Sequence, residues 1–248
     1  MSTTKWTWTR ALLALAALLA TVAWAPEQVQ AQSDVQLWTS ASLRYRATRT
    51  LRLEAGFLGR FDQDVSRGSL FGPQVGATLR LKKWFRMGAG YRYERRRIGG
   101  SLRNAHRLHF DLSLKRKFGR ARLGYRLRFQ ERFRDRASGA SDVRGALRNR
   151  LSLGIDTDSL FTPGVSVEFF TGLHGRHSGP LRKVRLTLSA RFDVDPVVLE
   201  AYYRVQIPVD QPGDPTEHII GLSVRFDVDG RRRRHRPASE HDTMSVTP

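Results

Sequence analysis

The sequence contains no cysteine among its 248 residues. Disulfides, thiolate metal sites, a cysteine nucleophile and lipid attachment at an N-terminal cysteine are therefore excluded. Acidic residues are also scarce, because 23 Asp and Glu stand against 43 Lys and Arg, which gives a formal charge of +20. Such an excess suits nucleic acid, an anionic membrane surface or anionic small molecules as partners, and charge alone does not choose among them.

No apolar run is long enough to span a bilayer comfortably as a helix, which takes about twenty residues. The apolar run at 11–25 follows Lys5 and Arg10, a pattern typical of a secretory signal peptide. Two sites have small residues at the spacing that signal peptidases require, but Pro26 follows the first of them. We therefore expect cleavage after Ala31, and an uncleaved membrane anchor is the alternative.

The rest of the chain lacks apolar stripes at helical spacing and shows two-residue alternation instead. In the stretch 121–134 the apolar residues take the odd positions, and five arginines share the even positions with Gly124 and Gln130. In a β-strand these two sets project to opposite faces. A solvated face of a soluble sheet would be unusually rich in arginine. A closed barrel with apolar residues outside and polar residues inside explains the pattern better.

Eleven segments alternate in this way, and most are long enough for a tilted strand to cross a membrane. They cover residues 35–47, 51–62, 70–82, 85–97, 103–117, 121–134, 145–156, 165–174, 182–194, 197–208 and 217–228. Their connections alternate between short and long, which is typical of membrane barrels, except that residues 157–164 form a medium connection where a short one is expected. The prediction is an all-β fold, a single antiparallel transmembrane β-barrel of about 10–12 strands with a polar, Arg-rich lumen.

The odd number of segments conflicts with the even strand number of bacterial single-chain barrels, whose two termini lie in the periplasm. We therefore expect ten or twelve strands. A missed strand, two segments forming one strand, or N-terminal residues threading the lumen would each remove the conflict. The predicted domains are a signal peptide at 1–31, an outer-membrane barrel at 32–228 and a basic, disordered tail at 229–248. An alternative for the tail is contact with anionic headgroups or the cell wall.

The polar faces of the segments predict a charged lumen. Its basic ladder is Arg122, Arg126, Arg128, Arg132, Arg148, Arg150, Arg185 and Arg191, and its acids are Glu54, Glu94, Asp111, Glu168 and Glu200. A guanidinium does not lose its proton, so each unpaired arginine keeps water or an anion beside it. The lumen is then either a narrow pore that favours anions or a barrel plugged by its own Arg–carboxylate pairs.

Few residues suggest catalysis or metal binding. His109, Asp111 and Ser113 share the polar face of one segment, as the His, acid and Ser of a barrel hydrolase would. They are more simply part of a charge network in the lumen. His174 and His177 in a long connection lack a nearby acid that would complete a metal site. We predict no catalytic residues, no metal and no cofactor.

The last segment carries a candidate assembly signal. Residues 219–226 resemble the C-terminal signal by which the outer-membrane assembly machinery recognises barrels, with Gly221, Val224 and Phe226 at the matching spacing.

Several segments also resemble a known family. They are the strand bearing Trp38, the Arg-Leu-Arg-Phe-Gln-Glu-Arg run at 126–132, the Glu-Phe-Phe at 168–170 and the closing His-Ile-Ile-Gly-Leu at 218–222. Together they look like the domain-of-unknown-function family 2490. The resemblance implies an outer-membrane barrel of unassigned role, with no catalytic residues to carry over.

The sequence thus predicts an integral protein of the Gram-negative outer membrane, exported through a cleaved signal peptide. The expected partners are outer-membrane lipids and lipopolysaccharide, the barrel assembly machinery and anionic solutes, with no nucleic acid and an open oligomeric state. One alternative is a soluble, secreted basic β-protein that binds polyanions, which would not depend on detergent. The second is an outer-membrane lipid hydrolase, which lipid hydrolysis would reveal.

Overall fold

The computed structural model describes residues 33–98, 100–135, 141–157, 159–174, 179–210 and 214–230, and all their regular structure is β. Eleven strands follow one another: β1 (Ser33–Arg46), β2 (Leu51–Asp62), β3 (Arg67–Arg80), β4 (Phe85–Ile98), β5 (Ser101–Phe118), β6 (Ala121–Asp135), β7 (Ser141–Ile155), β8 (Phe161–His174), β9 (Gly179–Val194), β10 (Val197–Pro208) and β11 (Thr216–Asp229). None of these residues forms a helix long and apolar enough to cross a membrane. The predicted signal peptide and the tail beyond residue 230 lie outside the described residues.

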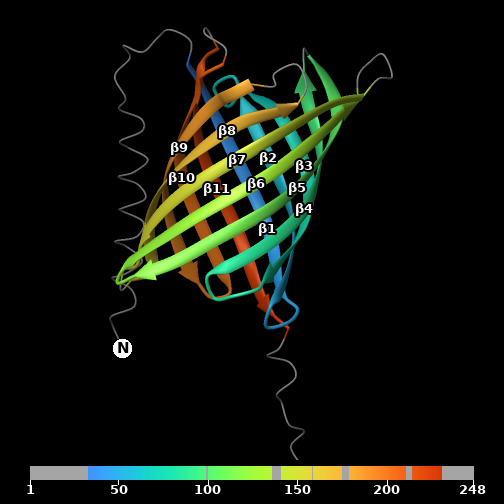
Figure 1. Ribbon diagram of the computed structural model, residues 1–248. Helices are drawn as coiled ribbons and strands as arrows, with labels where there is room; N and C mark the ends of the chain where they lie inside the picture. Colours follow the sequence, from blue (N-terminus) through green and yellow to red (C-terminus); the bar gives the residue numbers. More distant parts are fainter. Residues whose placement is uncertain are drawn as a thin grey trace, which may run out of the picture.

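The strands form one closed barrel. Each strand pairs antiparallel with the next in sequence, and β1 pairs with β11 in parallel to complete the ring. The parallel register runs without a shift from Ser33 opposite Thr216 to Arg46 opposite Asp229. Figure 1 shows β1 in blue and β11 in red crossing the barrel side by side. The expectation of ten or twelve strands in a purely antiparallel barrel is therefore wrong, because there are eleven strands in a mixed sheet.

The parallel closure follows from the odd strand number. The strands of a meander alternate in direction, so the first and the eleventh run the same way and can pair only in parallel. This pairing leaves no sheet edge with unpaired backbone groups. No missed or merged strand is needed, and threading of the lumen by N-terminal residues concerns a part of the chain outside the described residues.

The connections define two ends of the barrel. At one end, which we call the turn end, lie the connections 47–50, 81–84, 119–120, 156–160 and 195–196. At the other, which we call the loop end, lie the connections 63–66, 99–100, 136–140, 175–178 and 209–215. The predicted long connection at 98–102 has only two residues, because Ser101 and Leu102 continue the ladder opposite Ile98 and Arg97. Gly100 adopts a φ of 84°, which glycine tolerates and which suits a two-residue hairpin.

Apolar side chains cover the outer face of the barrel. Leu123 and Leu188, for example, are 47% and 50% exposed. Phe57, Val165 and Leu186 are exposed in the same way on other strands. Water-soluble monomers rarely expose apolar patches larger than a few hundred Å².

A small apolar core lies inside the barrel, toward the loop end. Its buried members are Trp38, Leu58, Leu70, Ala105 and Ile219. These residues occupy positions where the alternation calls for polar side chains. The interior therefore combines an apolar patch on one side with a strongly charged wall on the other.

Candidate functional site

Two cavities occupy the barrel interior. The larger, of about 610 Å³, has fifteen basic and five acidic side chains in its lining and reaches the loop end at Arg97, Asp62 and Asp210. The smaller, of about 330 Å³, lies toward the turn end and has six basic side chains and one acidic one. Both cavities are lined by Arg126 and Arg150, so they meet at these two side chains.

The predicted basic ladder divides between the two ends of the barrel. Six of its members line the larger cavity: Arg126, Arg128, Arg132, Arg148, Arg150 and Arg185. The other two lie nearer the turn end and line neither cavity. Arg122 pairs there with Asp156, and Arg191 pairs with Asp193 at 2.6 Å.

The predicted acids have different surroundings. Glu94 and Glu168 are buried, and each attracts several guanidinium groups, as described below. Glu54 forms one pair with Arg44 at 2.8 Å. Glu200 lies opposite Arg191 in the register of β9 and β10 but forms no ion pair with the described residues.

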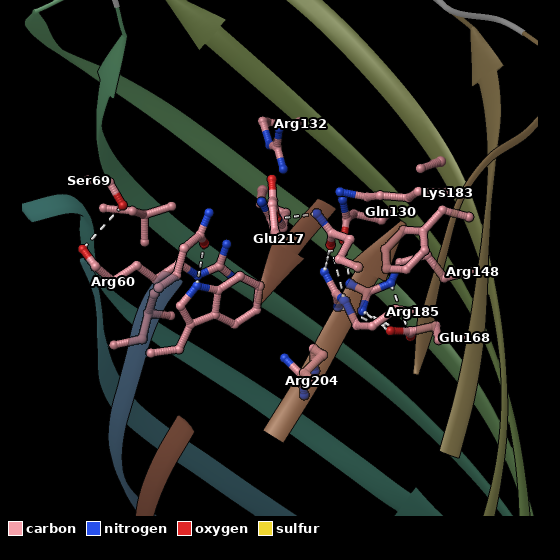
Figure 2. Close-up of a pocket in the computed structure, with 18 of the residues that line it drawn as sticks. Arg60, Ser69, Gln130, Arg132, Arg148, Glu168, Lys183, Arg185, Arg204 and Glu217 are labelled. Carbon is pink, nitrogen blue, oxygen red and sulfur yellow. Dashed lines mark hydrogen bonds and ion pairs between the residues drawn. The ribbon is translucent and has the colours of Figure 1, made fainter. Parts of the chain in front are cut away.

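Glu168 is the centre of a hydrogen-bonded cluster. Its carboxylate accepts hydrogen bonds from Arg126 at 2.8 Å, Arg148 at 2.8 Å and Arg185 at 3.2 Å. We call these four residues the Glu168 cluster, whose labelled members Arg148 and Arg185 converge on Glu168 in Figure 2. The cluster joins β6, β7, β8 and β9, and it leaves two positive charges in excess.

Aromatic rings support these guanidinium groups. The ring of Phe170 lies 4.6 Å from the guanidinium carbons of both Arg148 and Arg185. The guanidinium carbons of Arg60 and Arg204 lie 3.6 Å and 5.2 Å from the centre of the Trp38 ring. Contacts of this kind stabilise cations by about 0.5–2 kcal/mol each. The sequence prediction missed these rings, although both occupy polar-face positions of their strands.

A second cluster surrounds Glu94, which is fully buried. Arg107 approaches its carboxylate at 2.7 Å, while Arg92, Arg96 and Arg132 stay at 3.7–3.8 Å. We call these five residues the Glu94 cluster. Arg96 was not predicted as a lumen residue, because residues 95–97 are all arginine and hide the alternation. Four guanidinium groups thus share one carboxylate.

The candidate catalytic residues do not form a triad. Asp111 binds Arg128 through both oxygens at 2.6 and 2.7 Å, so it is not placed to orient His109. His109 instead covers Gly90, where a Cβ would lie 2.5 Å from its ring. His174 lies 3.7 Å from Glu131, and His177 is outside the described residues. Among the residues described, no three His, Asp or Glu side chains gather in a way that could hold a metal.

The residues of the candidate assembly signal lie on β11. Phe226 is exposed on the outer face, whereas Gly221 lies beneath the ring of Tyr202. Val224 lies opposite Leu199 of β10 and Ala41 of β1. Recognition by the assembly machinery stays a prediction.

Comparison with known proteins gives one match. The model of a family described as "Protein of unknown function (DUF2490)" matches residues 35–216. No curated protein matches the sequence. The matched stretch runs from the third residue of β1 to the first residue of β11, so it includes both charged clusters.

Proposed function

Starting from the fact that the chain belongs to the DUF2490 family, we propose that it is an outer-membrane β-barrel whose basic lumen admits small anions. The closed barrel and its apolar outer face support membrane insertion, because a barrel without sheet edges satisfies its backbone polar groups in lipid. The apolar run at 11–25 supports export by a cleaved signal peptide.

The charge of the lumen is the observation that carries the anion preference. Basic side chains outnumber acidic ones in the linings of both cavities. Arginine stays protonated, so this excess attracts anions and repels cations along the whole interior. Rings of Arg and Lys act in the same way in anion pores.

A plugged structural barrel is the second candidate. The Glu168 cluster favours it, because ion pairs join side chains of four strands across the lumen wall. The junction of the two cavities at Arg126 and Arg150 would then be closed, and the protein would contribute to the envelope without conducting.

Current through the purified barrel separates the two candidates. In a planar bilayer with different salt concentrations on its two sides, we expect the sign of the reversal potential to show that chloride passes more readily than the cation. Arg150→Glu should shift this potential toward cation selectivity, because Arg150 lines both cavities and has no carboxylate partner among the described residues. Arg225→Glu is the matched control, with the same change of charge, since Arg225 lines neither cavity. Cation selectivity of the unmodified protein would refute the proposal, and zero conductance would favour the plugged barrel.

Export gives a second expected result. The mature chain should begin at Gln32 and fractionate with the outer membrane, because the pattern of charged, apolar and small residues places cleavage after Ala31. Intact-mass measurement and membrane fractionation test this. Protein that is found in the periplasm without detergent would support the alternative of a soluble binder of polyanions.

A further inference from the structure

Four arginines stand side by side on the inner wall of the larger cavity. Arg92 lies opposite Arg107, Arg107 opposite Arg132, and Arg132 opposite Arg144, in one register row across β4 to β7. Neighbouring strands are about 4.8 Å apart, so this arginine row extends over roughly 14 Å. Like charges directly opposite one another destabilise a sheet. Negative charge beside the row would therefore stabilise it.

Glu94 supplies only part of that charge. Glu94 contacts three members of the row, but only Arg107 comes as close as 2.7 Å. Among the described residues, neither carboxylate oxygen of Glu94 accepts a well-formed hydrogen bond, and the Nε atoms of Arg107 and Arg132 are buried without a hydrogen-bond partner. The whole Glu94 cluster keeps three positive charges in excess.

The Glu168 cluster shows what a completed arrangement looks like in the same lumen. There, both carboxylate oxygens accept hydrogen bonds at ordinary distances from Arg126, Arg148 and Arg185. The contrast indicates that Glu94 does not satisfy the guanidinium donors that surround it. A buried guanidinium with unused donors is unfavourable, and an anion with several oxygens would satisfy it.

We propose that the arginine row is a binding site for a multivalent phosphate anion, with inorganic pyrophosphate as the simplest ligand. All four arginines line the larger cavity, which reaches the loop end and so gives a soluble anion a path to the row. Guanidinium forks match phosphate oxygens in geometry, and a ligand with several charges along its length suits a row of cations better than chloride does. The inference rests on the proposed basic lumen, but it does not require that the barrel conducts.

Calorimetric titration of the detergent-purified mature chain with inorganic pyrophosphate tests the site. In a low-chloride buffer we expect saturable binding at one site, weakened by added salt, and tighter than the binding of orthophosphate by about tenfold. Arg107→Gln combined with Arg132→Gln should weaken pyrophosphate binding by roughly a hundredfold, because each substitution removes charge-assisted hydrogen bonds. Arg107→Lys, which keeps the charge but removes the fork, should weaken it by about tenfold.

Two further variants separate the site from general effects of charge. Glu94→Gln should tighten pyrophosphate binding, because it removes the negative charge that competes with the ligand. Arg191→Gln should leave binding unchanged, since Arg191 lies outside the cavities. Each variant is first checked for the mobility difference between boiled and unboiled samples, which reports a folded barrel.

The outcomes distinguish this proposal from the proposed function. No saturable binding by the unmodified chain, unchanged binding by the Arg107 variants, or an equal loss with Arg191→Gln would each overturn the site. Binding without conductance would uphold the site and refute the pore. Conductance without binding would refute the site and uphold the pore.

Discussion

Replacing Glu168 by glutamine is expected to lower the free energy of unfolding by about 3–5 kcal/mol, the usual cost of removing one partner from a buried ion pair. Glutamine keeps the size of the side chain and one acceptor oxygen, so the loss reports charge and not packing. Arg126, Arg148 and Arg185 would then face one another without a carboxylate. Urea unfolding of the barrel in detergent micelles, followed by gel mobility, measures the change.

Glu54→Gln is the matched control for this substitution. Glu54 has Arg44 as its one ion-pair partner among the described residues, and both side chains are about one-third exposed. Pairs of this kind contribute only about 0–1 kcal/mol. Equal losses for the two variants would show that Glu168 is not a special centre of the lumen. A large loss confined to Glu168 would show that its cluster stabilises the barrel wall electrostatically.

The strands and their two faces could be predicted from the sequence, because alternation is a local property. In β6, for example, Leu123 and Phe129 are exposed while Arg126 and Gln130 face the interior, as the spacing predicted. The gaps left between the predicted segments at 118–120 and 195–196 are short connections in the structure as well. These features depend on neighbours only one or two positions apart.

The closure of the barrel could not be predicted in the same way. Pairing of β1 with β11 brings together residues nearly two hundred positions apart, such as Trp38 and Gly221. The general rule of even strand numbers then pointed to the wrong answer. The observed register also shows that the polar face of a barrel need not be polar throughout, because Leu70 and Ile219 are buried inside.

The ion-pair partners of the lumen charges could not be predicted from the sequence either. The sequence predicted Glu94 and Glu168 as lumen acids without distinguishing them from Glu200, which has no ion-pair partner among the described residues. The facing residues alone do not make the difference, because Glu168 lies opposite Arg150 and Arg185 and Glu200 likewise lies opposite Arg191. Two of the three partners of Glu168, Arg126 and Arg148, reach it from positions that are not directly opposite. Which charges meet depends on the relative shift of neighbouring strands and on how far each guanidinium reaches, and a single strand carries no record of either.

Replacing Leu188 by arginine is expected to cost about 2–4 kcal/mol in lipid, the penalty of a cation on the lipid-facing surface near the bilayer midplane. Leu188 lies near the middle of β9, is 50% exposed, and neighbours Val165 and Tyr203 on the outer face. Ser189→Arg should be far better tolerated. Ser189 points inward, where its hydroxyl donates to the backbone of Gly164 at 3.3 Å.

This pair of variants tests membrane insertion directly, because the two positions are adjacent and receive the same side chain. Urea unfolding in phospholipid vesicles gives the free energy for each. In a soluble barrel, an exposed Leu188→Arg would be nearly neutral and the inward Ser189→Arg would be the damaging change. Equal or reversed effects in vesicles would therefore contradict the assignment of the apolar face to lipid. The expected order, with Leu188→Arg the more costly, follows only if acyl chains surround the barrel.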